Sequence, residues 1–294
     1  MRRRAILRAV ALIAAVVLGT AAREALAFTW GEFEVLCRNA SAEELEAVLK
    51  RENVSIGAVR DDKTSLLMVA AEVTPNPDVI LTLVRLGADP NARDRDGWTA
   101  LMMAASKNSS PEAIATLVKA GADPNARDKE GWTALMLAAN SNSNPEVIAA
   151  LAKTDADPNA RNKDGWTALM MAARGNSNPE VIAALVKSGA DPSARTKGGG
   201  VALMVAAGKN SNPEVIAALL KVGADPNAKD KDGWTALMFA ASFNSNPEIL
   251  TTLLDAGADP KIIDHSGMTV MDHMKSNEKL KNTDVYWKLN DLSY

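Results

Sequence analysis

Few residues in this chain are suited to catalysis or metal binding. His265 and His273 are its only histidines, and each follows an aspartate, Asp264 or Asp272. The two histidines lie eight residues apart across an expected loop-to-helix boundary, so we expect solvated side chains and no metal pair. Cys37 is the only cysteine, which excludes an internal disulfide and a cysteine-based zinc site. Its apolar neighbours predict that it is buried as a small hydrophobic residue.

The glycines at 198–200, followed by Gly208 and Lys209, are the segment that comes closest to a phosphate-binding loop. That loop needs four residues between its glycines and a Ser or Thr after the lysine. Here seven residues intervene and Asn210 follows the lysine, so we reject the motif. Aspartates recur along the chain with Lys and Arg between them, which favours a solvated, charge-balanced edge over calcium sites. We therefore expect no catalytic residue, no metal site and no cofactor, and a protein that is not an enzyme.

A tryptophan motif recurs with a fixed period. Trp98, Trp132 and Trp166 are 34 residues apart, and Trp234 lies two periods further on, with Gly200 at the intervening position. An Ala-Leu-Met triplet keeps the same phase. Fixed-period repetition predicts a solenoid in which each unit packs only against its neighbours.

Each period predicts two short helices and a turn-rich finger. Thr133 can cap the first helix of its repeat with its hydroxyl, and Asn144-Pro145-Glu146 has the residue types that begin a second helix. Gly then ends the second helix in the left-handed conformation, at positions 87, 121, 189, 223 and 257. Asp155 stands at this position in its own repeat, so we expect a left-handed aspartate and a local weak point.

The pattern GWTALM…AA…NPEVIAALL…GADPNA resembles the ankyrin repeat. The resemblance implies an all-α repeat solenoid of stacked helix-turn-helix units with β-turn fingers. The family's T-P-L-H is T-A-L-M here, which removes the histidine that normally bonds neighbouring fingers, and the unit is one residue longer than the usual length of about 33. We expect an N-terminal capping unit in residues 28–62, six repeats of 34 residues in residues 63–266, and a C-terminal capping unit in residues 267–294.

Residues 1–27 read as a signal peptide. A basic start precedes an apolar run from Ala9 to Ala22, and Ala25-Leu26-Ala27 offers a cleavage site. We expect a periplasmic or secreted protein, with an uncleaved inner-membrane anchor facing the periplasm as the alternative. Loss of these residues removes five Arg and one Glu, so the net charge of −3 becomes −7. An acidic chain without a basic run is a poor match for nucleic acid or an anionic bilayer.

The resemblance places Trp98, Trp132, Trp166 and Trp234, with Met268 in the same phase, where the fingers meet a concave groove. We expect these residues to bind another protein noncovalently and the chain to be a monomer. The Gly200 interruption either weakens contact there or leaves room for a bulky element of the partner. Three alternatives stay open: rings that only pack between fingers, in a structural or stress-protective envelope protein; a non-catalytic subunit of an envelope enzyme; and an enzyme with its site in the groove.

Overall fold

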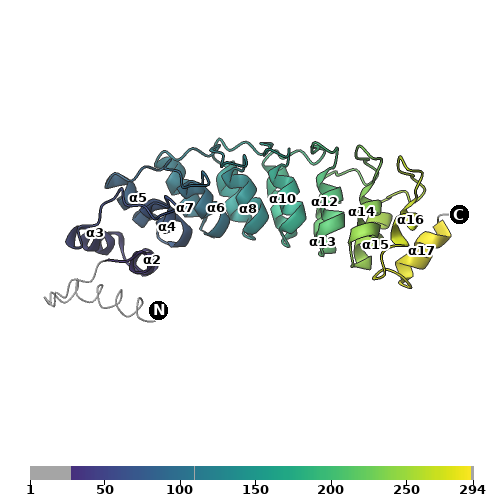
Figure 1. The fold of residues 1–294 in the computed structure, drawn as a ribbon, viewed down its shortest axis with the longest axis horizontal. Coiled ribbons are helices and arrows are strands. Elements are labelled where there is room, and N and C mark those ends of the chain that lie inside the picture. Colours follow the sequence, from purple (N-terminus) through teal and green to yellow (C-terminus); the bar gives the residue numbers. More distant parts are fainter. Residues whose placement is uncertain (1–27, 109, 293–294) are drawn as a thin grey trace. The chain divides into compact units, whose positions relative to one another are not determined.

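The structure, a computed structural model, describes residues 28–108 and 110–292, and the expected signal peptide at residues 1–27 lies outside them. The described residues form sixteen helices and no strand, and an isolated β-bridge joins Val59 to Ser65. The predicted all-α architecture of paired helices is therefore confirmed (Figure 1). No described helix combines the length and apolar character that crossing a membrane requires.

The chain divides into two units. The first consists of residues 28–129 and 153–156, and the second of residues 130–152 and 157–292. Helix pairs of the first unit, given as first and second helix, are α2 (Trp30–Asn39) with α3 (Ala42–Arg51), α4 (Leu66–Val73) with α5 (Pro77–Arg85), and α6 (Ala100–Lys107) with α7 (Pro111–Lys119).

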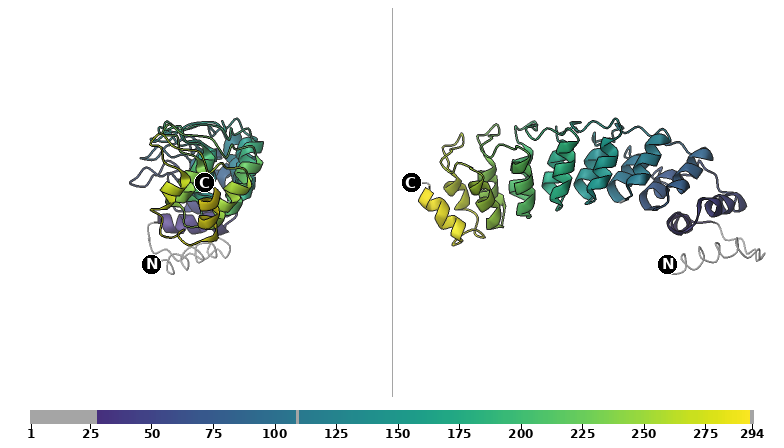
Figure 2. Two further views of the ribbon diagram at one scale, coloured as in Figure 1. Left: turned by 90° about the vertical axis from the view of Figure 1, so that its right-hand side faces the viewer. Right: turned by 180° about the vertical axis from the view of Figure 1, so that it is seen from behind.

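The second unit holds five helix pairs within its described residues: α8 (Ala134–Ser141) with α9 (Pro145–Ala152), α10 (Ala168–Gly175) with α11 (Pro179–Lys187), α12 (Ala202–Lys209) with α13 (Pro213–Lys221), α14 (Ala236–Phe243) with α15 (Pro247–Asp255), and α16 (Val270–Met274) with α17 (Asp284–Leu292). Its first helices pack in chain order, α8 on α10, α10 on α12, α12 on α14 and α14 on α16. Its fingers lie on one side of the helices in both Figure 1 and the right panel of Figure 2.

The predicted helix boundaries have the expected chemistry. The hydroxyl of Thr133 accepts a hydrogen bond from the backbone N–H of Met136 at 3.3 Å. Asn178 accepts one from Glu180 at 3.0 Å, and Pro179 fills the first helical position, where no N–H is needed. The five predicted glycines all have positive φ, from +88° to +105°. The N- and C-cap predictions for these repeats are confirmed.

A buried asparagine ladder joins successive repeats. The side-chain amide of Asn210, at the end of α12, donates to the carbonyls of Ala173 and Asn176 in the preceding repeat, both at 3.0 Å. Its carbonyl oxygen accepts from the N–H of Asn212 at 3.0 Å. Donation to two carbonyls of the preceding repeat recurs at Asn108 in the first unit and at Asn176, Asn244 and Asn277 in the second. These bonds give hydrogen-bond partners to backbone groups of the loop between the two helices, so buried polar contacts hold successive repeats in register.

The fingers have a ladder of their own. The side chain of Asn159 donates to the carbonyl of Gly189 at 2.9 Å and accepts from the N–H of Asp191 at 2.8 Å. Neighbouring fingers are also joined by their backbones, for example from the N–H of Lys231 to the carbonyl of Gly198 at 3.1 Å. Backbone and asparagine bonds thus connect the fingers although T-A-L-M lacks the family's histidine.

The predicted left-handed conformation of Asp155 is wrong. Among the described residues, only Asn53, Lys63 and Asn282 have positive φ without being glycine, so Asp155 is not left-handed. Helix α9 ends at Ala152, whereas α11 continues to Lys187, the position one residue further on in the repeat. The earlier helix end avoids the conformation that an aspartate would adopt only at a cost.

Candidate partner-binding surface

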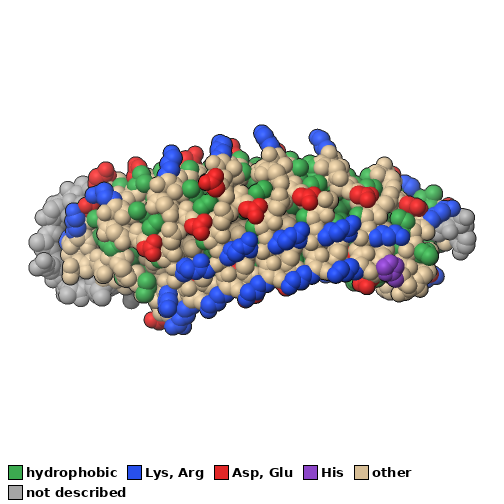
Figure 3. Space-filling view, turned by 90° about the horizontal axis from the view of Figure 1, so that it is seen from above, with side chains coloured by type: hydrophobic (Ala, Val, Ile, Leu, Met, Phe, Trp, Pro, Cys, Tyr) green, Lys and Arg blue, Asp and Glu red, His purple; other side chains and the backbone are tan. Residues whose placement is uncertain are grey.

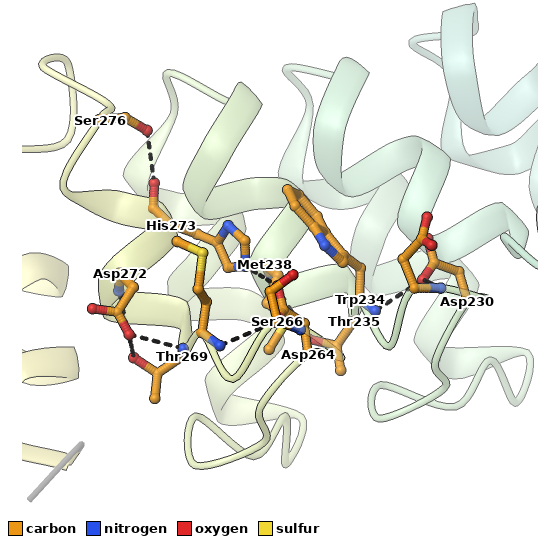
Figure 4. A network of polar contacts seen from close by, with 12 residues as sticks. Asp230, Trp234, Thr235, Met238, Asp264, Ser266, Thr269, Asp272, His273 and Ser276 are labelled. Carbon is orange, nitrogen blue, oxygen red and sulfur yellow. Dashed lines mark hydrogen bonds and ion pairs between the residues drawn. The ribbon is translucent and has the colours of Figure 1, made fainter.

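Three of the repeat tryptophans, Trp98, Trp166 and Trp234, are positioned by a turn at the base of the finger. Asp230 accepts hydrogen bonds from the N–H of Asp232 at 2.9 Å and of Trp234 at 2.9 Å, and its own N–H donates to the carbonyl of Trp234 at 3.0 Å (Figure 4). Thr235 follows and caps α14. The turn and the helix cap therefore fix the ring at the point where the finger meets the first helix.

The structure places the predicted site residues in both units. Trp98 belongs to the first unit, and Trp132, Trp166, Trp234 and Met268 belong to the second. All four tryptophans are half-buried, and Met268 is 38% exposed. Each therefore has part of its side chain packed and part in contact with solvent, which is compatible with packing and with binding.

The rings of the second unit have different surroundings. The guanidinium of Arg174 lies over the ring of Trp166, 5.9 Å from its centroid. Trp234 has aromatic neighbours on two helices: its ring centroid lies 5.2 Å from Phe239 and 6.0 Å from Phe243 on α14, and 4.1 Å from His273 on α16. We call Trp234, Phe239 and Phe243 the aromatic cluster.

His273 is not the solvated side chain that we predicted. It is 6% exposed and its Nε2 lies 2.9 Å from Oδ2 of Asp264, which is 5% exposed (Figure 4). The N–H groups of Met268 and Ser266 also donate to Asp264, and together with His273 they hold the pKa of its carboxyl below the usual value. The pair closes the last finger turn against the ring of Trp234. His265, in contrast, is exposed as predicted.

Gly200 occupies the tryptophan position of its repeat without changing the turn. Thr196 stands at the position that Asp230 has in the next repeat and makes the same turn bonds. Its hydroxyl accepts a hydrogen bond from the N–H of Gly200 at 3.1 Å, and its N–H donates to the carbonyl of Gly200 at 2.9 Å. A Cβ added to Gly200 would meet only the hydroxyl of Thr196, at 3.4 Å. The position can accept a side chain, and φ is not positive there.

The charges of the fingers are not balanced everywhere. Lys and Arg side chains repeat from finger to finger (Figure 3). In most fingers acids alternate with them, as in Arg93-Asp94-Arg95-Asp96. The finger segment Arg195-Thr196-Lys197-Gly198 contains no acidic residue, so it departs from the charge-balanced edge that we predicted.

The cysteine and the acidic side chains of the described residues form no metal-binding cluster. Cys37 is 1% exposed, as predicted, and burial raises the pKa of its thiol. Among the described residues, no three His, Cys, Asp or Glu side chains come together in a way that could hold a metal ion.

Three features of the structure were missed from the sequence. The aromatic cluster has a signal, because Phe239 and Phe243 are four residues apart and therefore share a helix face. The asparagine ladder has one too, since an asparagine follows the first helix with the 34-residue period from residue 108 to residue 244. The pairing of His273 with Asp264 has none, because it depends on how the last turn folds against α16.

The comparisons with known proteins agree with this architecture. The family described as ankyrin repeats (3 copies) matches residues 35–128, 67–162, 105–196 and 169–264. Comparison with curated proteins gives no significant match. Because the overlapping matches run from residue 35 to residue 264, the chain belongs to the ankyrin-repeat family.

Proposed function

We propose that this protein is a noncovalent protein-binding module, and that its first helices and fingers form the binding surface. Ankyrin repeats typically mediate protein–protein interaction and are generally not catalytic. A stack of repeats offers an extended surface because each unit repeats the same exposed positions. In the second unit the proposed contact residues are Trp132, Trp166, Trp234 and Met268, and Trp98 is their counterpart in the first.

The observation that supports this proposal is the repeat without a tryptophan. The repeat that begins at Gly199 keeps the finger bond between residues 196 and 200, and it keeps the asparagine bonds of Asn210. Its first helix, α12, has the same length as α10 and α14. A stack that forms without the ring at one position does not need the ring for its backbone, which favours recognition as the reason for the ring in the other repeats. Trp, Tyr and Arg are the residues most enriched at binding hot spots.

Packing is the second candidate role, and one observation favours it at one position. Trp234 lies against His273, Phe239 and Phe243, so its ring also stabilises the contact between α14 and α16. One part of a ring can pack while the other contacts a partner, and the two roles separate by experiment.

Photo-crosslinking in the producing cell tests the proposal. A photoreactive amino acid is placed at Trp166 or Met268, and, as a matched control, at Ala217, which is exposed on the second helix α13. We expect adducts with one partner from the first two positions and none from Ala217. Equal adducts at all three positions would contradict a binding surface on this face.

A double substitution separates recognition from packing. Trp132→Ala with Trp166→Ala should abolish the adduct formed from Met268 while the protein stays folded and its unfolding midpoint falls only modestly. A collapse of the midpoint would assign the rings to packing and place the binding surface elsewhere.

We also propose export to the periplasm or the cell exterior, with cleavage after Ala27. Small residues at Ala25 and Ala27 are those that signal peptidase requires. The intact mass of the exported protein tests this, since the proposed product begins at Phe28. A species in the membrane fraction that retains Met1 would establish the anchored alternative.

A further inference from the structure

We infer that the repeat from Gly199 to Asp232, together with the aromatic cluster on the next repeat, binds an acidic peptide segment that carries one large apolar side chain. The inference rests on the proposed function and names the chemistry of the partner. Three independent departures from the repeat meet at this place, all within the second unit. They concern the rings, the space beside them and the charge around them.

The rings are the first departure. At the position of Phe239 the neighbouring repeats have Leu137, Met171 and Val205. At the position of Phe243 they have Ser, Gly and Lys, at 141, 175 and 209. The stack forms with those residues, so the phenylalanines are not required by it.

The cluster nevertheless exposes apolar surface. Phe243 is 57% exposed although its ring stacks on Trp234 with an interplanar angle of 16°, and its centroid lies 6.1 Å from that of Phe239. Three adjoining aromatic rings form a contiguous patch, which is the kind of surface that receives an apolar anchor from a partner.

Space beside the rings is the second departure. Gly200 removes a tryptophan from the column between Trp166 and Trp234, and a side chain there would meet only Thr196. Gly208, on α12, is buried against Phe239: an added Cβ would be 3.6 Å from Cβ and Cδ1 of that side chain, so the glycine leaves no open space but lets the phenylalanine pack closely. Neither glycine has a left-handed backbone. Their small size, and not their conformation, therefore distinguishes this repeat from its neighbours.

Charge is the third departure. Helices α8, α10, α12 and α14 carry two charged side chains, Arg174 and Lys209, and no acid. The ammonium of Lys209 lies 5.7 Å from the centroid of Phe243, and Arg174 lies over Trp166, so one cation stands on either side of Gly200 in the chain.

The acids around this surface are mostly engaged. Asp264 is buried against His273, Asp272 on α16 pairs with Lys275 at 2.8 Å, and Asp230 accepts the bonds of its finger turn. Asp232 is exposed on the finger tip, where the exposed Lys229 and Lys231 outnumber it. The finger segment 195–198 adds Arg195 and Lys197 without an acid. The field at the aromatic cluster therefore favours a negatively charged partner.

Selection from a peptide library tests the inference directly, because it needs no identified partner. A random-peptide library displayed on phage is selected on the immobilised full chain, and the strongest binder is synthesised with a fluorescent label. We expect it to combine several Asp or Glu with one Trp, Phe, Leu or Met, and to bind more weakly as salt is raised.

Substitutions chosen to preserve the fold measure the contribution of each departure to binding. Phe243→Ser, which copies Ser141, should weaken binding about 30-fold, since truncation of a hot-spot anchor commonly has an effect of that size. Lys209→Gln should weaken it about threefold and reduce the salt dependence. Gly200→Trp fills the space and should weaken binding at least tenfold, whereas Ala217→Trp, on the second helix of the same repeat, should leave it unchanged.

The outcomes separate this inference from the proposed function. Selected peptides that are neutral or basic, or that bind Phe243→Ser and Gly200→Trp as tightly as the parent, overturn the inference. If such peptides still lose binding with Trp132→Ala, the proposed function stands and only the partner chemistry fails. A selection that yields no peptide also overturns the inference, and so does binding of single-stranded RNA at the same residues. In either case, the proposed function is tested separately by crosslinking at Trp166.

Discussion

The repeats that begin at Gly165 and at Gly199 are neighbours in the second unit with the same backbone and different surfaces. Each has a first helix of eight residues and a second helix of nine. Each donates a buried asparagine amide to two carbonyls of the repeat before it, through Asn176 and Asn210. Only the first carries a tryptophan. Val201 also leaves α12 without the side-chain cap that Thr167 gives α10. The comparison indicates that the asparagine ladder, the caps of the second helices and the glycines build the stack, and that the ring is an addition to it.

We expect the greatest loss of stability from removing the asparagine ladder in the repeat that has no tryptophan. Asn210→Leu leaves two carbonyls and one N–H of the buried loop without partners, and an unsatisfied buried group costs about 1–3 kcal/mol. We expect the free energy of unfolding to fall by about 3 kcal/mol, measured by urea denaturation. Asn212→Ala, which removes a helix cap and one exposed bond to the carbonyl of Ser177 in the preceding repeat, should cost about 1 kcal/mol. Equal losses from the two variants would show that the ladder is not the main contact between repeats.

Removing rings gives the next effect. Trp234→Ala should cost about 2 kcal/mol and Trp166→Ala about 1 kcal/mol, because both rings are half-buried but Trp234 also packs on His273 and two phenylalanines. Thermal unfolding of the two variants measures the difference. A larger loss from Trp166→Ala would contradict the view that this ring is an addition to the stack.

Alanine substitutions at the adjacent Gly199 and Gly200 should have smaller and unequal effects on stability. Gly199 has φ of +85°, and a Cβ there would lie 2.9 Å from the backbone nitrogen of Lys231. Gly199→Ala should therefore lower the unfolding free energy by at least about 1 kcal/mol. Gly200→Ala should stay within about 0.5 kcal/mol of the parent. If both were equally harmful, Gly200 would have a backbone role, and the space beside the rings would lose its significance.

Protonation of Asp264 at low pH should change the stability least. The pKa of Asp264 is below its usual value in the folded protein, so its contribution to stability is complete above the pKa of the unfolded chain, about 4, and is lost as pH falls below that. Asp264→Asn copies Asn162, which accepts the N–H bonds of its own finger turn at 3.0 and 2.9 Å. We expect this variant to unfold with a weaker dependence on pH below about 4. An unchanged pH dependence would assign acid sensitivity to other carboxylates.

Most of the fold could be predicted from the sequence because its determinants are local. Thr caps, Pro at the first helical position and left-handed Gly each act within a few residues, and the 34-residue period carries them along the chain. The prediction that Asp155 is left-handed was wrong, because ending α9 early avoids a conformation that the local pattern required.

The contacts between repeats, and the surface that they position, were less predictable because the residues that determine them lie in different repeats. Asn210 bonds to residues 34 and 37 positions before it, so its role is visible only once the repeats are stacked. The burial of His273 depends on Asp264 and on the ring of Trp234, which come from other elements. The position of the tryptophans followed from the period, and their half-burial did not.

The asparagine ladder also has an evolutionary consequence. Asn176, Asn210 and Asn244 in the second unit each donate an amide to two carbonyls of the preceding repeat, and Asn210 offers its own carbonyl to Asn244 in turn. A block of 34 residues can therefore be duplicated or deleted by recombination without leaving an unpaired group at the new junction. Such a chain can change its number of repeats in a single genetic event, and substitutions such as Gly200 or Phe243 can then diversify each copy separately.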